Sequence, residues 1–255
     1  MSDWRTLHFF DSDYMLNKVI PEIKTNEKYL TDYFNSALGK QLFWNDIKEN
    51  RITEIQRLAL DLTEDFTRHK NLYDLESTVR RNAESYDDYI HRRSVDIKEF
   101  LHNNVSIIED FNRIFTLIIF SECAAFNPHL VLGRRIFSGC IETKEKSLAE
   151  SCCDKLITPD TGSIFITNDA IYNWLTQDEV HLLYYDFDKV SPADDDALDY
   201  YLDFKKIVEI AHQKNLGLMA CSNVRECVLC QVRSRLDLRI DIDDFISGSV
   251  IMYKG

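Results

Sequence analysis

The sequence predicts a mixed α+β protein that is mostly helical, with a helical region over residues 1–126 and a small α/β region over 127–255. Three observations favour this division. Gly and Pro punctuate secondary structure, and only Pro21 and Gly39 occur before residue 126. Apolar residues recur at helical spacing in this first region, and short apolar runs bounded by turn residues follow it. The two regions can pack as one compact body.

The first region predicts about five helices in a bundle-like arrangement. Leu16, Val19, Ile20 and Ile23 form one apolar face, with Asp11 or Ser12 as the candidate N-cap. Further apolar faces run over residues 52–66 and 72–101. The run 105–126 is apolar on nearly all sides, which predicts a buried helix ended by Asn127-Pro128.

The second region predicts about four strands and one strong helix. Residues 163–167, 180–187, 216–221 and 249–253 are the expected strands. Residues 195–215 carry the expected helix, which Asn215 or Gly217 should end. Alternation of strand and helix favours a small α/β unit.

The net charge of −13 bears on partners. Nucleic acids and anionic membranes require clusters of Lys and Arg, and no basic stripe runs along this chain. We therefore expect no nucleic acid and no membrane as partner. A partner protein with a basic surface is compatible with the charge.

A cytoplasmic location is expected. The first residues contain no long apolar segment of the signal-peptide kind, and the longest apolar stretch, 114–120, is far shorter than a membrane span. The seven cysteines are odd in number and irregularly spaced, which favours reduced thiols.

The strongest local anomaly is acidic: residues 178–203 hold nine acidic side chains and one lysine. Aspartates at a helix start complement the helix dipole, which explains part of this pattern. The remainder predicts a docking surface or a metal site. The candidate partner-binding residues are Asp186, Asp188, Asp194, Asp195, Asp196, Asp199 and Asp203.

Within this stretch, an apolar run ends in Asp186-Phe187-Asp188. It resembles the first motif of haloacid-dehalogenase-type phosphatases. The resemblance implies that Asp186 is a nucleophile and Asp188 an acid/base beside Mg²⁺, with Ser222 at the end of the next strand and Asp243-Asp244 as the later acidic motif. Chemically, two carboxylates at one strand end can bind a hard cation.

The remaining motifs carry little chemistry. Cys227-x-x-Cys230 follows a predicted strand and is compatible with buried packing, with zinc or with redox chemistry, although no second pair completes a zinc site. Cys123, His129 and Cys140 can meet around Asn127-Pro128. No HExxH, nucleophile elbow or phosphate loop occurs. We expect no cofactor.

Three functions remain open. The first is a non-enzymatic, acidic protein-binding module, such as an inhibitor or immunity-type protein that neutralises its partner. The second is a Mg²⁺-dependent phosphatase or phosphotransferase that uses Asp186 and Asp188. The third is a helical scaffold or oligomerisation protein. The absence of catalytic motifs makes the first the principal expectation.

Overall fold

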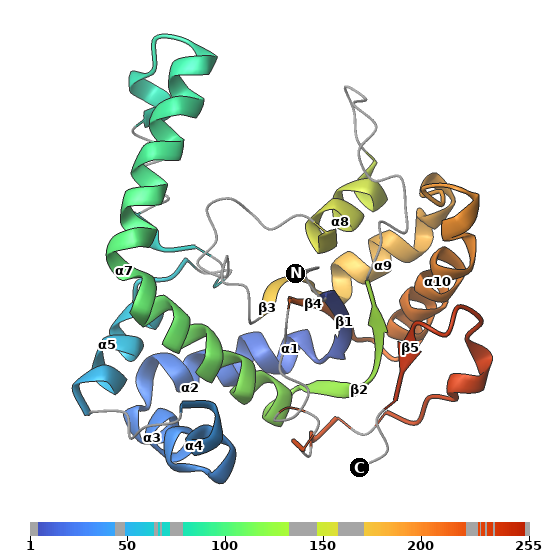
Figure 1. Ribbon diagram of the computed structural model, residues 1–255, viewed down its shortest axis with the longest axis horizontal. Helices are drawn as coiled ribbons and strands as arrows, with labels where there is room; N and C mark the ends of the chain where they lie inside the picture. Colours follow the sequence, from blue (N-terminus) through green and yellow to red (C-terminus); the bar gives the residue numbers. More distant parts are fainter. Residues whose placement is uncertain are drawn as a thin grey trace.

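The computed structural model describes residues 5–43, 49–63, 66, 68–71, 79–132, 147–157, 171–222, 229, 231–232, 234–236 and 238–252. The fold is mixed α+β and mostly helical, as the sequence predicts, and it contains a five-stranded antiparallel sheet (Figure 1).

The strands come from distant parts of the chain. They are β1 (Arg5–Phe10), β2 (Ala124–Val131), β3 (Ile171–Leu175), β4 (Gly217–Ser222) and β5 (Val250–Ile251). Their order in the sheet is β3-β4-β1-β2-β5, and every neighbouring pair is antiparallel. The amino-terminal strand is therefore the centre of the sheet.

Helices make up most of the remaining described chain. The first group is α1 (Ser12–Tyr14), a π-helical turn (Met15–Val19), α2 (Ile20–Thr25), α3 (Glu27–Asn35), α4 (Ala37–Phe43), α5 (Glu49–Leu60) and α7 (Tyr86–Glu122). The second group is α8 (Leu148–Ile157), α9 (Gln177–Tyr185) and α10 (Leu198–Gln213), with 3-10 turns at Phe187–Lys189, Asp195–Ala197 and Ile242–Asp244.

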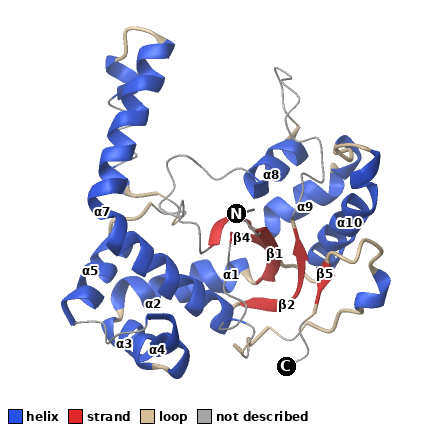
Figure 2. Ribbon diagram, viewed as in Figure 1, coloured by secondary structure: helices blue, strands red, loops and turns tan. Residues whose placement is uncertain are grey.

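Helices cover both faces of the sheet, and Figure 2 shows the strands between the two helical groups. Alternate strand residues point to opposite faces. In β4, Met219 and Cys221 join a core with the first helical group, whereas Leu218 and Ala220 join a second core with α8, α9 and α10. The sheet thus separates two hydrophobic cores, which makes three layers.

Strand β1 lies inside the region that the sequence predicts as helical. Leu7 and Phe9 enter the core with α8–α10, while Phe10 enters the other core. This alternation over six residues is a strand pattern, and it is too short to stand out beside the long helical periodicity that follows. The division at residue 126 stays a prediction, and β1 and β4 exchange hydrogen bonds across it.

The predicted helices 72–101 and 105–126 are partly merged in the structure. Helix α7 is continuous from Tyr86 and ends at Glu122, and the expected helical residues 124–126 belong to β2. An all-apolar run fits a buried helix and a buried strand equally well, so periodicity could not place this boundary. Asp11 is the N-cap of α1, as expected, because its carboxylate accepts the amide of Tyr14 at 2.9 Å.

The strand predicted over 180–187 is wrong, because α9 occupies Gln177–Tyr185. The expected helix at 195–215 is confirmed as α10 with its preceding 3-10 turn, and the strands at 216–221 and 249–253 correspond to β4 and β5. The predicted strand 163–167 lies outside the described residues.

Candidate functional site

The acidic stretch 178–203 covers α9 from its second residue, the connecting turns and the first part of α10; the two helices pack together, and we name them the α9–α10 hairpin. The ring of Phe187 lies 5.5 Å from that of Tyr201, and the ring of Tyr184 lies 4.0 Å from that of His212. The first contact joins the turn after α9 to the beginning of α10, and the second joins the last turn of α9 to the last turn of α10. The carboxylates are consequently displayed around one helical pair.

The first acids of this stretch stabilise the start of α9. The Thr176 hydroxyl accepts the amide of Glu179, and the Glu179 carboxylate accepts the amide of Thr176 at 2.8 Å, which is a capping box. Glu179 also pairs with Lys155 of α8 at 2.7 Å. The Thr-x-x-Glu spacing is the signal that could have identified this helix from the sequence.

Asp186 and Asp188 do not follow a strand. Asp186 is the C-cap of α9 and pairs with Lys189 at 2.8 Å, and Asp188 is exposed in the following 3-10 turn. The phosphatase-like motif requires these two carboxylates at the end of a strand. The structure has the helix α9 where that strand was expected. Ser222, in contrast, is the last residue of strand β4, and Asp243-Asp244 lie in a 3-10 turn.

The next three aspartates begin α10. Asp194 is an N-cap whose carboxylate accepts the amide of Ala197 at 2.9 Å. Asp195 and Asp196 are exposed, and neither side chain forms an ion pair or hydrogen bond within the described ranges. Capping therefore explains Asp194 and leaves its two neighbours without a structural partner.

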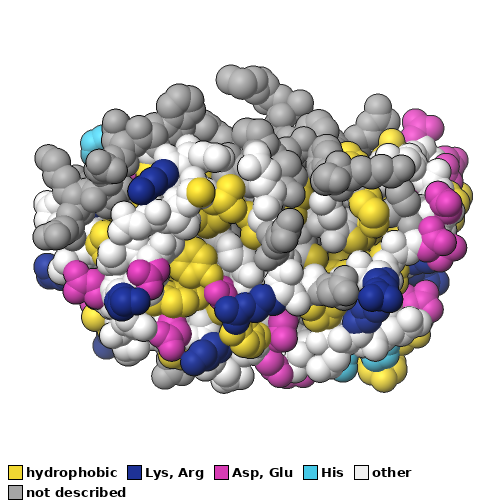
Figure 3. All heavy atoms as spheres, turned by 90° about the horizontal axis from the view of Figure 1, so that it is seen from below, with side chains coloured by type: hydrophobic (Ala, Val, Ile, Leu, Met, Phe, Trp, Pro, Cys, Tyr) yellow, Lys and Arg dark blue, Asp and Glu magenta, His cyan; other side chains and the backbone are white. Residues whose placement is uncertain are grey.

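The outward side of α10 combines acidic and apolar residues. Asp195, Leu198, Asp199 and Leu202 follow the spacing that brings side chains onto one helix face. Leu198 is 45% exposed and Leu202 is 40% exposed. We name these four residues the α10 outer face. Figure 3 shows acidic side chains gathered at the end of the molecule where α10 lies.

Asp203 has a different role from the other predicted residues. It is only 2% exposed, and its two carboxylate oxygens accept the amides of Ile246 and Ser247, each at 2.9 Å. The Ser247 hydroxyl also donates to it. Asp203 thus anchors the segment before β5 to α10 and is not accessible to a partner.

An aromatic and histidine cluster on the hairpin was not predicted. The His181 and His212 rings lie 4.6 Å apart, and Tyr184 stacks on His212. Desolvation, and then the neighbouring His181, lower the pKa of His212 below its usual value. Tyr185, which contacts His212 edge-on, is 72% exposed.

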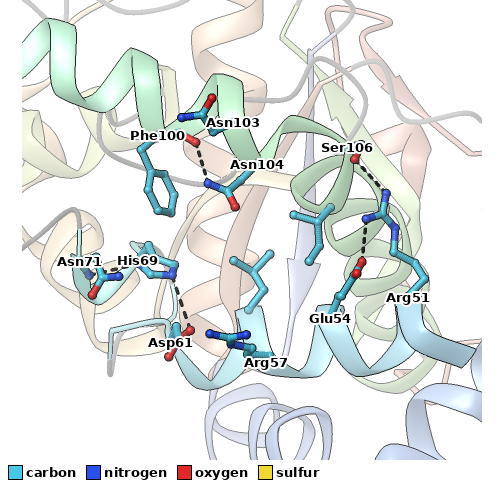
Figure 4. Close-up of a pocket in the computed structure, with 12 residues that line it drawn as sticks. Arg51, Glu54, Arg57, Asp61, His69, Asn71, Phe100, Asn103, Asn104 and Ser106 are labelled. Carbon is cyan, nitrogen blue, oxygen red and sulfur yellow. Dashed lines mark hydrogen bonds and ion pairs between the residues drawn. The ribbon is translucent and has the colours of Figure 1, made fainter.

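A second feature is a pocket of about 460 Å³ between α5 and α7, which no sequence motif indicated. Figure 4 shows side chains of the two helices facing each other across it, with His69 and Asn71 at one end and Arg51 and Ser106 at the other. The pocket is lined by Arg51, Glu54, Arg57, Leu58, Asp61, His69, Asn71, Phe100, Asn103, Asn104, Ser106 and Ile107.

At one end of this pocket, Arg51 is held in contacts between α5 and α7. The Arg51 guanidinium donates to Asp110 at 2.8 Å, to Glu54 at 3.0 Å and to the Ser106 hydroxyl at 2.9 Å. These contacts hold α5 against α7. Because the one charge of Arg51 is shared between Glu54 and Asp110, its guanidinium is already occupied by two carboxylates.

The other end contains a neutral histidine. The His69 Nδ1 atom accepts the amide of Asn71 at 3.1 Å, so the proton is on Nε2, which lies 3.8 Å from the Asp61 carboxylate. Burial lowers the pKa of His69, although Asp61 acts in the opposite direction. Near neutral pH this histidine therefore leaves the Asp61 charge uncompensated.

The remaining predicted motifs are placed only in part. Cys152 and Cys153 are buried free thiols in α8, whereas Cys140, Cys227 and Cys230 lie outside the described residues. Where the chain is described, no group of three or more His, Cys, Asp or Glu side chains could hold a metal ion. Its helices also include none with the length and apolar character needed to cross a bilayer.

Comparison of the chain with protein-family models, with curated proteins and with solved structures gives no match.

Proposed function

We propose that the protein is a non-catalytic binding module of the inhibitor or immunity type, which neutralises a basic partner protein through the α10 outer face. The observation that carries this proposal is the exposure of Leu198 and Leu202 beside Asp195 and Asp199, whose carboxylates form no ion pair within the residues that the structure describes.

The apolar part of this face supports a protein as the ligand. Single exposed leucines are common on protein surfaces, but Leu198 and Leu202 are one helical turn apart and point the same way. A helix face with apolar residues at this spacing can lie against an apolar strip of a partner. The two leucines would supply the centre of such a contact.

The charged part supports a basic partner. Asp188, Asp195, Asp196 and Asp199 are exposed and form no ion pair or side-chain hydrogen bond within the described part of the chain. Their repulsion is relieved when Lys or Arg side chains approach. Complementary charges of this kind raise association rates and select partners more than they raise affinity.

A cytoplasmic location belongs to the same proposal. Cys123, Cys152, Cys153 and Cys221 are free and buried, which suits a reducing compartment.

The proposal is tested by affinity capture from the native cell extract, with the wild type compared against the double variant Asp195→Asn/Asp199→Asn and against Leu198→Ser/Leu202→Ser. A protein retained by the wild type and lost from both variants is the expected partner. Its association rate with the wild type should fall steeply as salt is added, because the attraction between charged surfaces is screened.

A matched control removes two exposed carboxylates elsewhere, through Glu99→Gln/Glu109→Gln on α7. This variant should retain the partner. Equal capture by the Asp195→Asn/Asp199→Asn variant and the wild type, or an association rate that does not respond to salt, would contradict the proposed role of this face.

A further inference from the structure

The pocket between α5 and α7 contains polar side chains whose hydrogen-bonding capacity is not used by the fold. The Arg57 guanidinium forms no ion pair or hydrogen bond with any part of the chain that the structure describes, although it can donate five. The side-chain amides of Asn71 and Asn103 likewise have no partner within these ranges, and Asn104 uses only its amino group, on the Phe100 carbonyl.

The charges of the pocket sum to zero but are separated. Arg51 pairs with Glu54 and also with Asp110 outside the lining, and the other charged lining residues are Arg57 and Asp61. Arg57 is on α5 and Asp61 is the first residue after it, and the Asp61 amide donates to the Arg57 carbonyl at 3.1 Å. This is the backbone spacing at which Cβ atoms four positions apart lie about 5–6 Å from each other. The two side chains do not come within ion-pair distance of each other, and the only charged or titratable partner of Asp61 in the described chain is the neutral His69. One free positive and one free negative group therefore stand side by side.

Three of the twelve residues that line the pocket are apolar. Leu58, Phe100 and Ile107 lie among the polar lining residues, and Figure 4 shows the Phe100 ring directed into the space between the two helices. A volume of about 460 Å³ lies within the range of small-ligand sites. The pocket thus offers a ligand nine polar or charged side chains and three apolar ones, which suits a small polar molecule with one apolar group.

We propose that this pocket binds a small zwitterion of the amino-acid or short-peptide class that carries an apolar side chain. The ligand carboxylate pairs with the Arg57 guanidinium, whose planar fork matches two carboxylate oxygens. The ligand ammonium pairs with Asp61. The apolar side chain lies on Leu58, Phe100 and Ile107, and the asparagine amides contact the remaining polar atoms of the ligand. This site is separate from the α10 outer face and does not depend on its role.

The test is calorimetric titration of the full chain with leucine and with leucyl-leucine, which distinguishes a free amino acid from a short peptide as the ligand. Two blocked compounds serve as controls in the same titration: N-acetyl-leucine, which lacks the ammonium, and leucine amide, which lacks the carboxylate. Leucine or leucyl-leucine should bind with a dissociation constant in the millimolar range or below. Each of the two blocked compounds should bind at least about tenfold more weakly than the zwitterion. Amide chemical shifts of Asn103 and Asn104 should report the location.

Variants of the two charged residues complete the test. Arg57→Ala and Asp61→Asn should each weaken zwitterion binding by about tenfold or more, and Arg57→Lys should retain part of it because the charge remains. Lys214→Ala, which removes an exposed cation at the end of α10, is the matched control and should bind as the wild type does. Unfolding midpoints should be unchanged, since neither the Arg57 nor the Asp61 side chain forms a hydrogen bond with any described residue.

Three results would each overturn the proposal. The first is no binding of leucine or leucyl-leucine at concentrations up to about tens of millimolar. The others are binding of the blocked compounds as tight as that of the zwitterions, and binding by Arg57→Ala as tight as by the wild type.

Discussion

His8 and His129 are opposite each other in the pairing of β1 with β2, and both Nδ1 atoms lie within hydrogen-bond distance of the same carbonyl, that of Phe126, at 3.2 and 3.0 Å. The His8 Nε2 atom lies 2.8 Å from the Thr6 hydroxyl. A neutral His8 that donates from Nδ1 and accepts at Nε2 satisfies both contacts. The centre of the sheet thus holds an uncharged histidine with no exposed surface.

Acidification should destabilise the protein through this histidine. Burial, and then His129, hold the pKa of His8 well below its usual value of 6.5. Below pH 6.5 the unfolded chain binds a proton that the folded chain excludes, so the free energy of unfolding falls as pH falls. The slope is about 1.4 kcal/mol per pH unit for one proton. Urea unfolding at a series of pH values between neutral and mildly acidic measures it.

The same series with His8→Gln isolates this contribution, because His69 and His212 also have lowered pKa values. In His8→Gln the free energy of unfolding should fall less steeply with falling pH than in the wild type. The control His91→Gln, at an exposed position, should show the wild-type slope. Identical slopes for the wild type and His8→Gln would show that His8 is not excluded from protonation in the folded state.

Phe204 should be essential to the core that joins α10 to the sheet. It has no exposed surface, and its ring lies 5.7 Å from that of Phe187. Phe204→Ala should cost about 3–5 kcal/mol of unfolding free energy, through lost burial and the cavity left behind. Tyr185→Ala, an aromatic truncation at a 72% exposed position of the same hairpin, should change stability by about 0.5 kcal/mol or less. Chemical denaturation compares the two, and similar losses would contradict the burial of Phe204.

Asp203 should hold the carboxy-terminal segment in place. Asp203→Ala leaves the amides of Ile246 and Ser247 without their acceptor and should cost about 1.5–3 kcal/mol. Hydrogen exchange should show faster exchange of these two amides. Asp199→Ala removes an exposed carboxylate of the same helix and should leave their exchange unchanged. Unaltered exchange in Asp203→Ala would mean that the segment is held by other contacts.

The four buried thiols should react slowly in the folded protein. Burial raises the pKa of Cys123, Cys153 and Cys221, and it raises the pKa of Cys152 to about 11 with a further contribution from Glu179. The thiolate is the reactive form, and at pH 8 it is scarce at such sites. Iodoacetamide followed by peptide mass spectrometry should label these four cysteines only after denaturation. Rapid native labelling of Cys221 would contradict its position inside the sheet.

Much of the helical fold could be predicted from the sequence, because its cause is local. Apolar spacing over residues 16–23 marks the π-helical turn and α2, and the spacing from Ile52 to Ala59 marks α5. The last two positions of that second pattern, Leu62 and Phe66, lie beyond the end of α5 at Leu60. The aspartates at 194–196 mark the turn that leads into α10, although only Asp194 is a cap. The errors occurred where local signals compete. The run 180–187 is as apolar as a strand, and the capping box at Thr176 and Glu179 decides for a helix.

The candidate sites also divide into features that the sequence indicated and features that depend on long-range contacts. The acidic stretch was visible as composition, and α10 presents Asp195 and Asp199 on one exposed face. That Asp203, in the same stretch, turns inward to Ser247 could not be foreseen, because its partners lie more than forty residues away. The pocket could not be predicted from the sequence, since Arg57 and Asn103 line the same cavity only when α5 packs against α7.

The sequence by itself determined the helical content, the acidic charge and the exposed start of α10, since these follow from periodicity, composition and capping within a few residues. Only the tertiary structure decided that β1 is the centre of the sheet and that a pocket opens between α5 and α7. Both depend on contacts between residues far apart in the chain. Such contacts arise from burial and shape complementarity, for which no local pattern in the sequence is specific.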